Sequence, residues 1–147
     1  MTGKVLYTGG TFDLFHAGHV NFLSRCKLIA DTVVVSLNSD KFIRDYKGFD
    51  PFHSFEERKL ILESCIYCDK VICNTGDADS TEAIEKVQPH IIAIGTDWAN
   101  KDYYAQMGFT QEWLDIRNIV MVYIPYTKDV SSTIIKQKII DRSKANK

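Results

Sequence analysis

This 147-residue sequence lacks several features that would mark other classes of protein. It has no apolar run near the roughly 18 residues that a membrane-spanning helix needs, and residues 1–10 lack the basic-then-apolar order of a signal peptide. The formal net charge is only -1, from 18 basic and 19 acidic side chains. No overall positive field would therefore attract nucleic acid or a membrane surface. We expect a cytoplasmic protein that binds neither.

Cysteine is also scarce, with Cys26, Cys65, Cys68 and Cys73 as its four residues. They lie in apolar stretches, which in a reducing compartment is typical of small buried hydrophobic side chains. Cys65 and Cys68 have the spacing of a zinc or redox pair, but no second cysteine pair or histidine pair follows at metal-site spacing. A thioredoxin-like motif would begin a helix, whereas this pair follows a helical pattern. The sequence thus predicts no metal held by protein ligands.

The hydrophobic pattern switches repeatedly between strand-like and helix-like periods along the chain. With 45% apolar residues, the length suits one domain, which we place at residues 1–142 with a solvated tail at 143–147. The expected strands are 4–8, 32–37, 70–73, 90–94 and 119–123, and the expected helices are 19–30, 54–64, 81–87, 109–116 and a last one from about 131. This alternation predicts an α/β fold, a Rossmann-like open parallel sheet of about five strands with helices on both faces.

Ligands of open parallel sheets bind beyond the carboxyl ends of the strands. In this sequence the corresponding segments are 9–19, 38–47, 95–101 and 125–133, and they are rich in polar residues that have no evident role in a core. Residues 38–46, just before Lys47, have the composition of a mobile stretch. We expect the functional side chains to come from these four segments.

The most informative run begins with a glycine turn at Gly9 and ends at His19, with the sequence Gly-Gly-Thr-Phe-Asp-Leu-Phe-His-Ala-Gly-His. A spacing of three would put the imidazoles of His16 and His19 on one helical face. Gly18 would leave room for a ligand to approach the backbone, and a helix start offers free amide groups to phosphate. A histidine pair alone is more often structural, but this setting suits a triphosphate.

The whole run resembles the signature of the HxGH nucleotidyltransferases, and Gly-Thr-Phe-Asp-Leu resembles their cytidylyltransferase branch, above all glycerol-3-phosphate cytidylyltransferase. Residues 53–63, 95–98 and 130–133 resemble further motifs of that branch, so the likeness covers nearly the entire chain. It implies an enzyme that transfers CMP from CTP to a phosphorylated small molecule, glycerol-3-phosphate-like or a sugar phosphate, with release of pyrophosphate. It also implies a homodimer, and Mg²⁺ that arrives with the nucleoside triphosphate.

The resemblance assigns roles to individual residues. It implies catalytic roles for His16, His19 and Lys47. It implies nucleotide binding by Gly10, Thr11, Phe12, Gly18, Asp97, Trp98, Ser131, Ser132 and Thr133. Arg58, in the matching helix, becomes a candidate phosphate or active-site contact.

Elementary chemistry agrees with a charge-stabilising role for the histidines. A phosphate monoester has a second pKa of about 6, so the attacking oxygen is already largely ionised and needs no strong base. We therefore expect His16 and His19 to donate hydrogen bonds to the transition state. Plainer interpretations remain open for other residues: Lys47 as a surface lysine, Trp98 as a packed aromatic, Arg58 in a structural ion pair, and the residues at 131–133 as a helix cap.

The sequence departs from the resembling branch at three places. Tyr126 and Ile66 stand where that branch has arginines. Lys47-Gly48 followed by Phe49 resembles the sugar-phosphate and heptose-phosphate branch more closely, and the second lysine of this loop is missing. Two other functions are therefore kept open. One is an adenylyltransferase that acts on a heptose phosphate or on flavin mononucleotide, and the other is a non-catalytic nucleotide-binding module.

Overall fold

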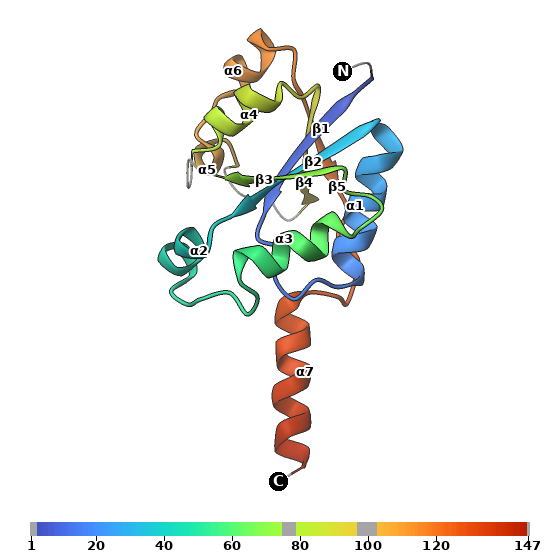
Figure 1. The fold of residues 1–147 in the computed structure, drawn as a ribbon, viewed down its shortest axis with the longest axis vertical. Helices are drawn as coiled ribbons and strands as arrows, with labels where there is room; N and C mark the ends of the chain where they lie inside the picture. Colours follow the sequence, from blue (N-terminus) through green and yellow to red (C-terminus); the bar gives the residue numbers. More distant parts are fainter. Residues whose placement is uncertain (1–2, 75–78, 97–102, 147) are drawn as a thin grey trace.

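The computed structural model describes residues 3–74, 79–96 and 103–146, which form an α/β domain around a parallel sheet (Figure 1). The strands are β1 (Val5–Gly10), β2 (Thr32–Asn38), β3 (Lys70–Asn74), β4 (Ile91–Gly95) and β5 (Val120–Ile124). Their order in the sheet is β3-β2-β1-β4-β5. The sheet order reverses between β1 and β4, which is where open parallel sheets bind their ligands. The predicted fold class is confirmed.

Seven helices connect or follow these strands in the described residues. They are α1 (Ala17–Ile29), α2 (Asp40–Lys47), α3 (Phe55–Glu63), α4 (Thr81–Val87), α5 (Tyr103–Met107), α6 (Gln111–Ile116) and α7 (Ser132–Ala145). None of the described helices is long and apolar enough to cross a bilayer. Two of them, α2 and α5, were not predicted from the sequence.

Interpreting residues 38–46 as a mobile stretch missed a helix, because residues 40–46 belong to α2. The side chain of Ser39 caps this helix by accepting a hydrogen bond from the Phe42 amide at 3.1 Å. Gly48 ends it in the left-handed conformation, with φ of 81°. Serine before a helix and glycine after it are ordinary boundary signals. Because α2 has only eight residues and lies in a polar segment, these signals did not predict a helix there.

The core consists of two clusters, one on each face of the sheet. Because side chains alternate along a strand, Leu6 of β1 packs in the cluster that includes Leu23 of α1 and Leu62 of α3. The next residue, Tyr7, packs in the cluster that includes Ile84 of α4 and Leu114 of α6. Helices thus cover both faces, as the uninterrupted apolar strands predicted.

The sheet opens between β1 and β4 at their carboxyl ends. β1 pairs with β2 over its whole length, to Gly10 opposite Leu37, but its ladder with β4 stops after Tyr7 and Ile92. Beyond that point the buried hydroxyl of Thr8 donates to the Ala93 carbonyl at 2.9 Å. This bond joins the strands where the ladder ends, and the space beyond it becomes a cleft.

Helix α7 extends away from the rest of the domain and ends near the carboxyl terminus (Figure 1). None of its residues is buried, and the side chains of Ile139 and Ile140 are exposed. The helix continues to Ala145, so residues 143–145 are helical; the domain boundary at residue 142 stays a prediction.

The four cysteines differ in their surroundings. Cys26 and Cys68 are buried, as expected from their apolar neighbours, and burial raises the pKa of the Cys68 thiol to about 11. Cys65 is partly exposed, and Cys73 is exposed, so the expectation of a buried side chain was wrong for Cys73. The reason is that Cys73 lies on β3, an edge strand of the sheet that is only partly covered.

Candidate active site

A cleft of about 850 Å³ lies at the carboxyl ends of the strands. This volume is in the range of small-molecule sites and leaves room for a nucleotide. Its lining includes the following residues that the sequence predicted: Gly10, Thr11, Phe12, His16, Gly18, His19, Lys47, Ser131, Ser132 and Thr133. Asp97 and Trp98 lie outside the described residues, so their predicted roles stay predictions.

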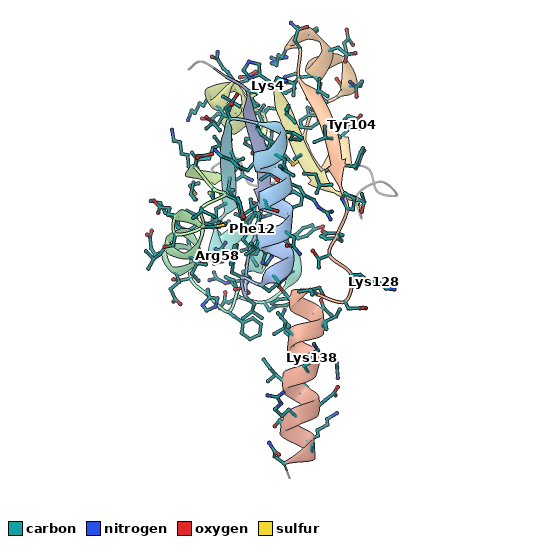
Figure 2. The ribbon with its side chains drawn as sticks, turned by 90° about the vertical axis from the view of Figure 1, so that its right-hand side faces the viewer. Lys4, Phe12, Arg58, Tyr104, Lys128 and Lys138 are labelled. Carbon is teal, nitrogen blue, oxygen red and sulfur yellow. The ribbon has the colours of Figure 1, made fainter. Side chains whose placement is uncertain are left out.

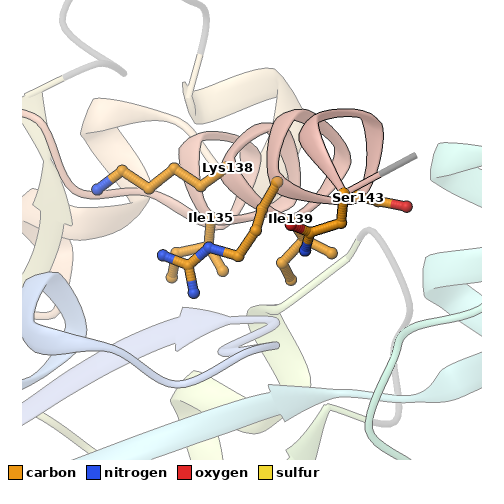
Figure 3. A pocket seen from close by; sticks show the side chains of 6 residues that line it. Ile135, Lys138, Ile139 and Ser143 are labelled. Carbon is orange, nitrogen blue, oxygen red and sulfur yellow. The ribbon is translucent and has the colours of Figure 1, made fainter.

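A second hollow, of about 370 Å³, lies along α7 (Figure 3). Its lining comes from that helix alone and consists of Ile135, Lys138, Ile139, Arg142, Ser143 and Asn146. None of the predicted site residues is among them. The larger cleft is therefore the candidate active site.

His16 and His19 lock each other at the start of α1. His16 is the cap residue before the helix, with extended backbone, and its Nδ1 accepts a hydrogen bond from the Gly18 amide at 3.0 Å. The His16 amide donates in turn to His19 Nδ1 at 3.1 Å. The ring centroids are 3.8 Å apart and the rings are stacked. The histidines meet as predicted, but through a reciprocal cap and not by sharing a helical face.

Both imidazoles are uncharged near neutral pH. Burial, and then the neighbouring His16, lower the pKa of His19 to about 3, and partial burial lowers the pKa of His16. Since each Nδ1 accepts a hydrogen bond, each neutral ring carries its proton on Nε2. The pair therefore supplies two N–H donors to the cleft without adding charge. An anionic ligand bound beside the rings would favour protonation of the imidazoles again.

Two glycines are required by the aromatic rings around this pair. A Cβ on Gly18 would lie 2.8 Å from the His16 ring, and a Cβ on Gly10 would lie 2.8 Å from the Phe12 ring. Phe12 has a left-handed backbone, with φ of 50°, and its ring lies 5.2 Å from that of His19. Gly18 was expected to admit a ligand to the backbone. In the structure it admits the imidazole of His16, which then lines the cleft.

Arg58 lies beneath the cleft and holds its loops together (Figure 2). Its side chain is fully buried and forms an ion pair with Asp40 at 2.6 Å. Its guanidinium also donates to the carbonyls of Thr11, Asn38 and His53 at 2.9 to 3.0 Å. The structural ion pair proposed as the plainer interpretation is thus present. Direct contact of Arg58 with phosphate stays a prediction, and the buried guanidinium is not part of the cleft lining.

A chain of amide side chains crosses the floor of the cleft. Asn74, at the end of β3, donates to Asn38 at the end of β2, and Asn38 donates to the Thr11 hydroxyl, both at 3.2 Å. Both asparagines line the cleft but were not predicted as site residues. Their place directly after β-branched runs, at the edge where ligands bind, was the signal that could have found them.

The start of α7 forms another wall of the cleft. The Ser131 hydroxyl caps the helix by accepting from the Ile134 amide at 3.1 Å, and the Ser132 hydroxyl donates to the Asp13 carbonyl at 2.9 Å. Two of the three predicted hydroxyls therefore have structural partners, and Thr133 lines the cleft from an exposed position. The amides of Ser132 and Thr133 precede the first hydrogen bond within α7, and free amides at a helix start can bind an anion.

Lys47 is the last residue of α2 and lines the cleft from that helix. Partial removal from water, followed by repulsion from Lys136, lowers the pKa of its ammonium group. Lys136 itself was not predicted. The aromatic side chains of Phe42, Tyr46 and Phe49 also line this side and were not predicted either, because aromatic residues in a short amphipathic helix are usually core residues.

Comparison with known proteins agrees with this arrangement. The sequence model of the cytidylyltransferase-like family matches residues 7–138, which include all the described parts of the cleft. The chain belongs to this family. It is therefore a nucleotidyltransferase, as the resemblance implied.

Two curated relatives of this nucleotidyltransferase cover nearly its full length. Glycerol-3-phosphate cytidylyltransferase of Bacillus subtilis is 35% identical over 136 residues, which are 92% of this chain and 97% of the relative. FAD synthase of Thermococcus sibiricus is 36% identical over 139 residues, 91% of this chain and 90% of the relative. The two relatives carry different names at nearly equal identity, so identity alone does not select the nucleotide.

Among solved structures, the lipopolysaccharide core biosynthesis protein from Thermoplasma volcanium has a TM-score of 0.68 with this nucleotidyltransferase. The two share 22% identity, and the alignment covers 86% of this chain and 98% of the other. At this identity the likeness concerns the fold alone.

Proposed function

We propose that this nucleotidyltransferase transfers CMP from CTP to a phosphorylated small molecule, glycerol-3-phosphate-like or a sugar phosphate, and gives a CDP-linked product. The observation that carries the proposal is the pair of neutral imidazoles, His16 and His19, at the start of α1 in the same cleft as the start of α7. Two helix starts and two Nε2 donors suit the oxygens of a triphosphate. The similarity to glycerol-3-phosphate cytidylyltransferase over 92% of the chain supports CTP and this acceptor class.

In the proposed reaction an ionised oxygen of the acceptor's phosphate attacks the α-phosphorus of CTP. A new phosphorus–oxygen bond forms, the bond to the β-phosphate oxygen breaks, and pyrophosphate leaves with that electron pair. Negative charge then grows on the equatorial oxygens and on the leaving group. The Nε2–H groups of His16 and His19 stabilise this charge. Because each Nε2 already carries its proton, each Nδ1 already accepts a hydrogen bond and both pKa values are lowered, the rings act as hydrogen-bond donors and not as bases.

Lys47 faces the same reaction centre from α2. A partly desolvated ammonium group that forms no ion pair in the described part of the chain can stabilise the negative charge that appears only as the phosphates react. We assign nucleotide binding to Gly10, Thr11, Phe12, Gly18 and the turn at residues 131–133, and to Asp97 and Trp98 beyond the described residues. Arg58 supports this surface from below.

Mg²⁺ fits as a companion of the triphosphate. In the described part of the chain no three His, Cys, Asp or Glu side chains gather as metal ligands, and the carboxylate of Asp13 already accepts from the amides of Phe52 and His53. A hard cation held mainly by phosphate oxygens and water needs few protein ligands. When bound, Mg²⁺ would neutralise charge on the leaving pyrophosphate.

Adenylyl transfer from ATP is the second candidate, and one observation favours it. FAD synthase of Thermococcus sibiricus is as similar to this chain as the cytidylyltransferase of Bacillus subtilis. The same histidines and helix starts would serve ATP. A non-catalytic nucleotide-binding module is less well supported, because the donors of the cleft are retained together.

Pyrophosphate release decides between these functions. Each of CTP, ATP, GTP and UTP is combined with glycerol 3-phosphate, a heptose phosphate, a hexose 1-phosphate and flavin mononucleotide in the presence of Mg²⁺. We expect turnover with CTP and an alcohol or sugar phosphate. Turnover only with ATP and flavin mononucleotide or a heptose phosphate would establish the second candidate. CTP binding by calorimetry with no turnover in any pair would favour the non-catalytic module.

We also propose that the enzyme forms a homodimer. Helix α7 supports this, because it leaves Ile139 and Ile140 exposed and buries none of its residues in the single chain. Light scattering coupled to size exclusion should give about twice the 16.8 kDa mass of one chain. A mass of one chain across micromolar concentrations would refute the dimer without affecting the assignment of the active site.

A further inference from the structure

A second lysine, Lys136, faces the cleft from α7. Its ammonium nitrogen lies 4.9 Å from the ring centroid of Phe49 and 5.0 Å from that of Phe52. Both rings belong to the segment between α2 and α3, so this ammonium group connects α7 to that segment. Cation–π contacts of this kind attract an ammonium group but leave its charge uncompensated.

Among the ion pairs of the described residues, none includes Lys136 or Lys47. The nearby carboxylate of Asp13 is occupied by two backbone amides. Residues 48–53 contain no lysine or arginine, so the cations on this side of the cleft are Lys47 from α2 and Lys136 from α7.

Two cations that line one cleft repel each other unless an anion lies between them. Lys136 is close enough to disfavour the charged form of Lys47, and the attraction of Asp13 offsets this repulsion only in part. An unsatisfied pair of this kind costs free energy in the empty protein. A dianionic phosphate would remove that cost and accept hydrogen bonds from both ammonium groups.

We propose that Lys136 is a phosphate-binding residue that, opposite Lys47, holds the phosphate of the acceptor. The proposal rests on the proposed nucleotidyl transfer and names a specificity residue for its second substrate. The start of α1 and the first turn of α7 serve the triphosphate, and Lys136 lies one turn further along α7, beside Phe49 and Phe52. These rings are 48% and 62% exposed, so they leave apolar surface for the carbon skeleton attached to the phosphate.

The first test replaces one lysine at a time on the same helix. Lys136→Ala should raise the KM for glycerol 3-phosphate about ten- to hundredfold, the range for a charge-assisted hydrogen bond, and leave the KM for CTP within about twofold. Lys138→Ala is the matched control, because Lys138 lines the separate hollow on α7 and should change neither constant. An equal rise in both KM values for Lys136→Ala would instead assign Lys136 to the triphosphate and overturn the proposal.

A charge-relocation variant separates binding from a merely structural effect. The Phe49 ring lies against the ammonium group of Lys136, so a lysine at position 49 can reach the same space. The double variant Lys136→Ala/Phe49→Lys should recover at least a tenth of the lost acceptor kcat/KM. Phe49→Ala with Lys136→Ala should recover nothing. Equal failure of both double variants, in proteins with wild-type circular dichroism, would contradict a role for the charge itself.

A binding measurement keeps this inference separate from the proposed reaction. Titration calorimetry with inorganic phosphate should give a millimolar Kd for the unmodified protein and for Lys138→Ala, and at least fivefold weaker binding for Lys136→Ala. If no substrate pair releases pyrophosphate but phosphate binding still depends on Lys136, the proposed reaction fails and the anion site remains. If phosphate binding is unchanged in Lys136→Ala, the site fails whatever the enzyme's substrates are.

Discussion

The two walls of the cleft are built in opposite ways. At the start of α1, His16 and His19 are fixed by reciprocal hydrogen bonds, by their stacked rings and by the close approach of the His16 ring to Gly18. On the side of α2 and α7, Lys47 and Lys136 have no ion partners in the described structure, and they lie among aromatic rings that are about half exposed. Several contacts thus fix the two histidines, whereas few contacts fix the two lysines.

This difference matches what each wall must do. Charge stabilisation at a reacting phosphorus depends on donors whose positions are fixed before the substrate arrives. Recognition of a particular acceptor needs only complementary charge and apolar surface, and it can change without disturbing the chemistry. We therefore infer that the α1 wall carries the reaction common to the family, and that Lys136 with the rings of Phe49 and Phe52 carries the specificity of this enzyme.

The largest effect should follow from loss of a donor in the fixed wall. His19→Ala should lower kcat by roughly two to three orders of magnitude, because a preorganised hydrogen bond to the developing charge is removed. His16→Ala should behave similarly. Pyrophosphate release measures the rate, and circular dichroism checks that the protein remains folded. A folded His19→Ala protein with near wild-type turnover would show that the fixed wall is not the catalytic one.

Arg58 tests whether the fixed wall depends on the scaffold beneath it. Arg58→Met should lower the free energy of unfolding by about 3 kcal/mol, since three carbonyls and the carboxylate of Asp40 lose their buried partner. Urea denaturation measures this change. Lys59→Met, on the exposed face of the same helix, is the control and should change stability by less than about 0.5 kcal/mol. Equal stability of the two variants would contradict a structural role for Arg58.

Sequence reasoning succeeded where one short segment determines the structure. Residues 4–8 and the run from Gly9 to His19 predicted a strand followed by a helix start, and these features bring His16 and His19 together as expected. The predicted turn at Gly9 was wrong, because Gly9 and Gly10 still pair with β2 as the last residues of β1. The open sheet also followed from local periodicity. What the sequence could not reveal depends on distant parts of the chain: Arg58 reaches carbonyls 47 and 20 residues away, and Lys136 meets Phe49 only when α7 is placed.

Gly18 has a second role that the sequence did not reveal. A glycine between two histidines suggested access for a ligand, which stays a prediction, and the structure shows that Gly18 also makes room for the His16 ring. Gly18→Ala should therefore displace that ring, which is a flexible side chain, and lower kcat about tenfold or more with little loss of stability. Ala17→Gly is a matched control for backbone flexibility at the same helix start. Unchanged turnover in a folded Gly18→Ala protein would show that the tight packing of His16 has no catalytic value.

Protonation of His19 at low pH should destabilise the α1 wall without a substitution. The pKa of His19 is about 3 in the folded protein and 6.5 as its ordinary value, so the unfolded chain binds the proton more readily between these limits. Stability should therefore be constant above about pH 6.5 and fall as the pH decreases toward 3. Urea denaturation between pH 7 and 5 should show a steeper loss for the unmodified protein than for His19→Asn. Parallel curves would mean that His19 is not held in its neutral form.

The smallest expected effect concerns Tyr126, which lies between β5 and α7. Its side chain is 57% exposed and lines the cleft just before the turn of Ser131 to Thr133, where the resembling branch carries an arginine. Tyr126→Arg would offer a guanidinium fork to the triphosphate, and an exposed site would realise only part of the 1.5 to 3 kcal/mol of a charge-assisted bond. CTP binding should tighten several-fold, and the choice of acceptor should not change, since Lys136 and the aromatic rings are untouched. Titration calorimetry with CTP, followed by the acceptor series, measures both. Unchanged or weaker CTP binding would mean that Tyr126 itself contacts the base or the acceptor. Substrate specificity would then also depend on the part of the cleft that binds the triphosphate.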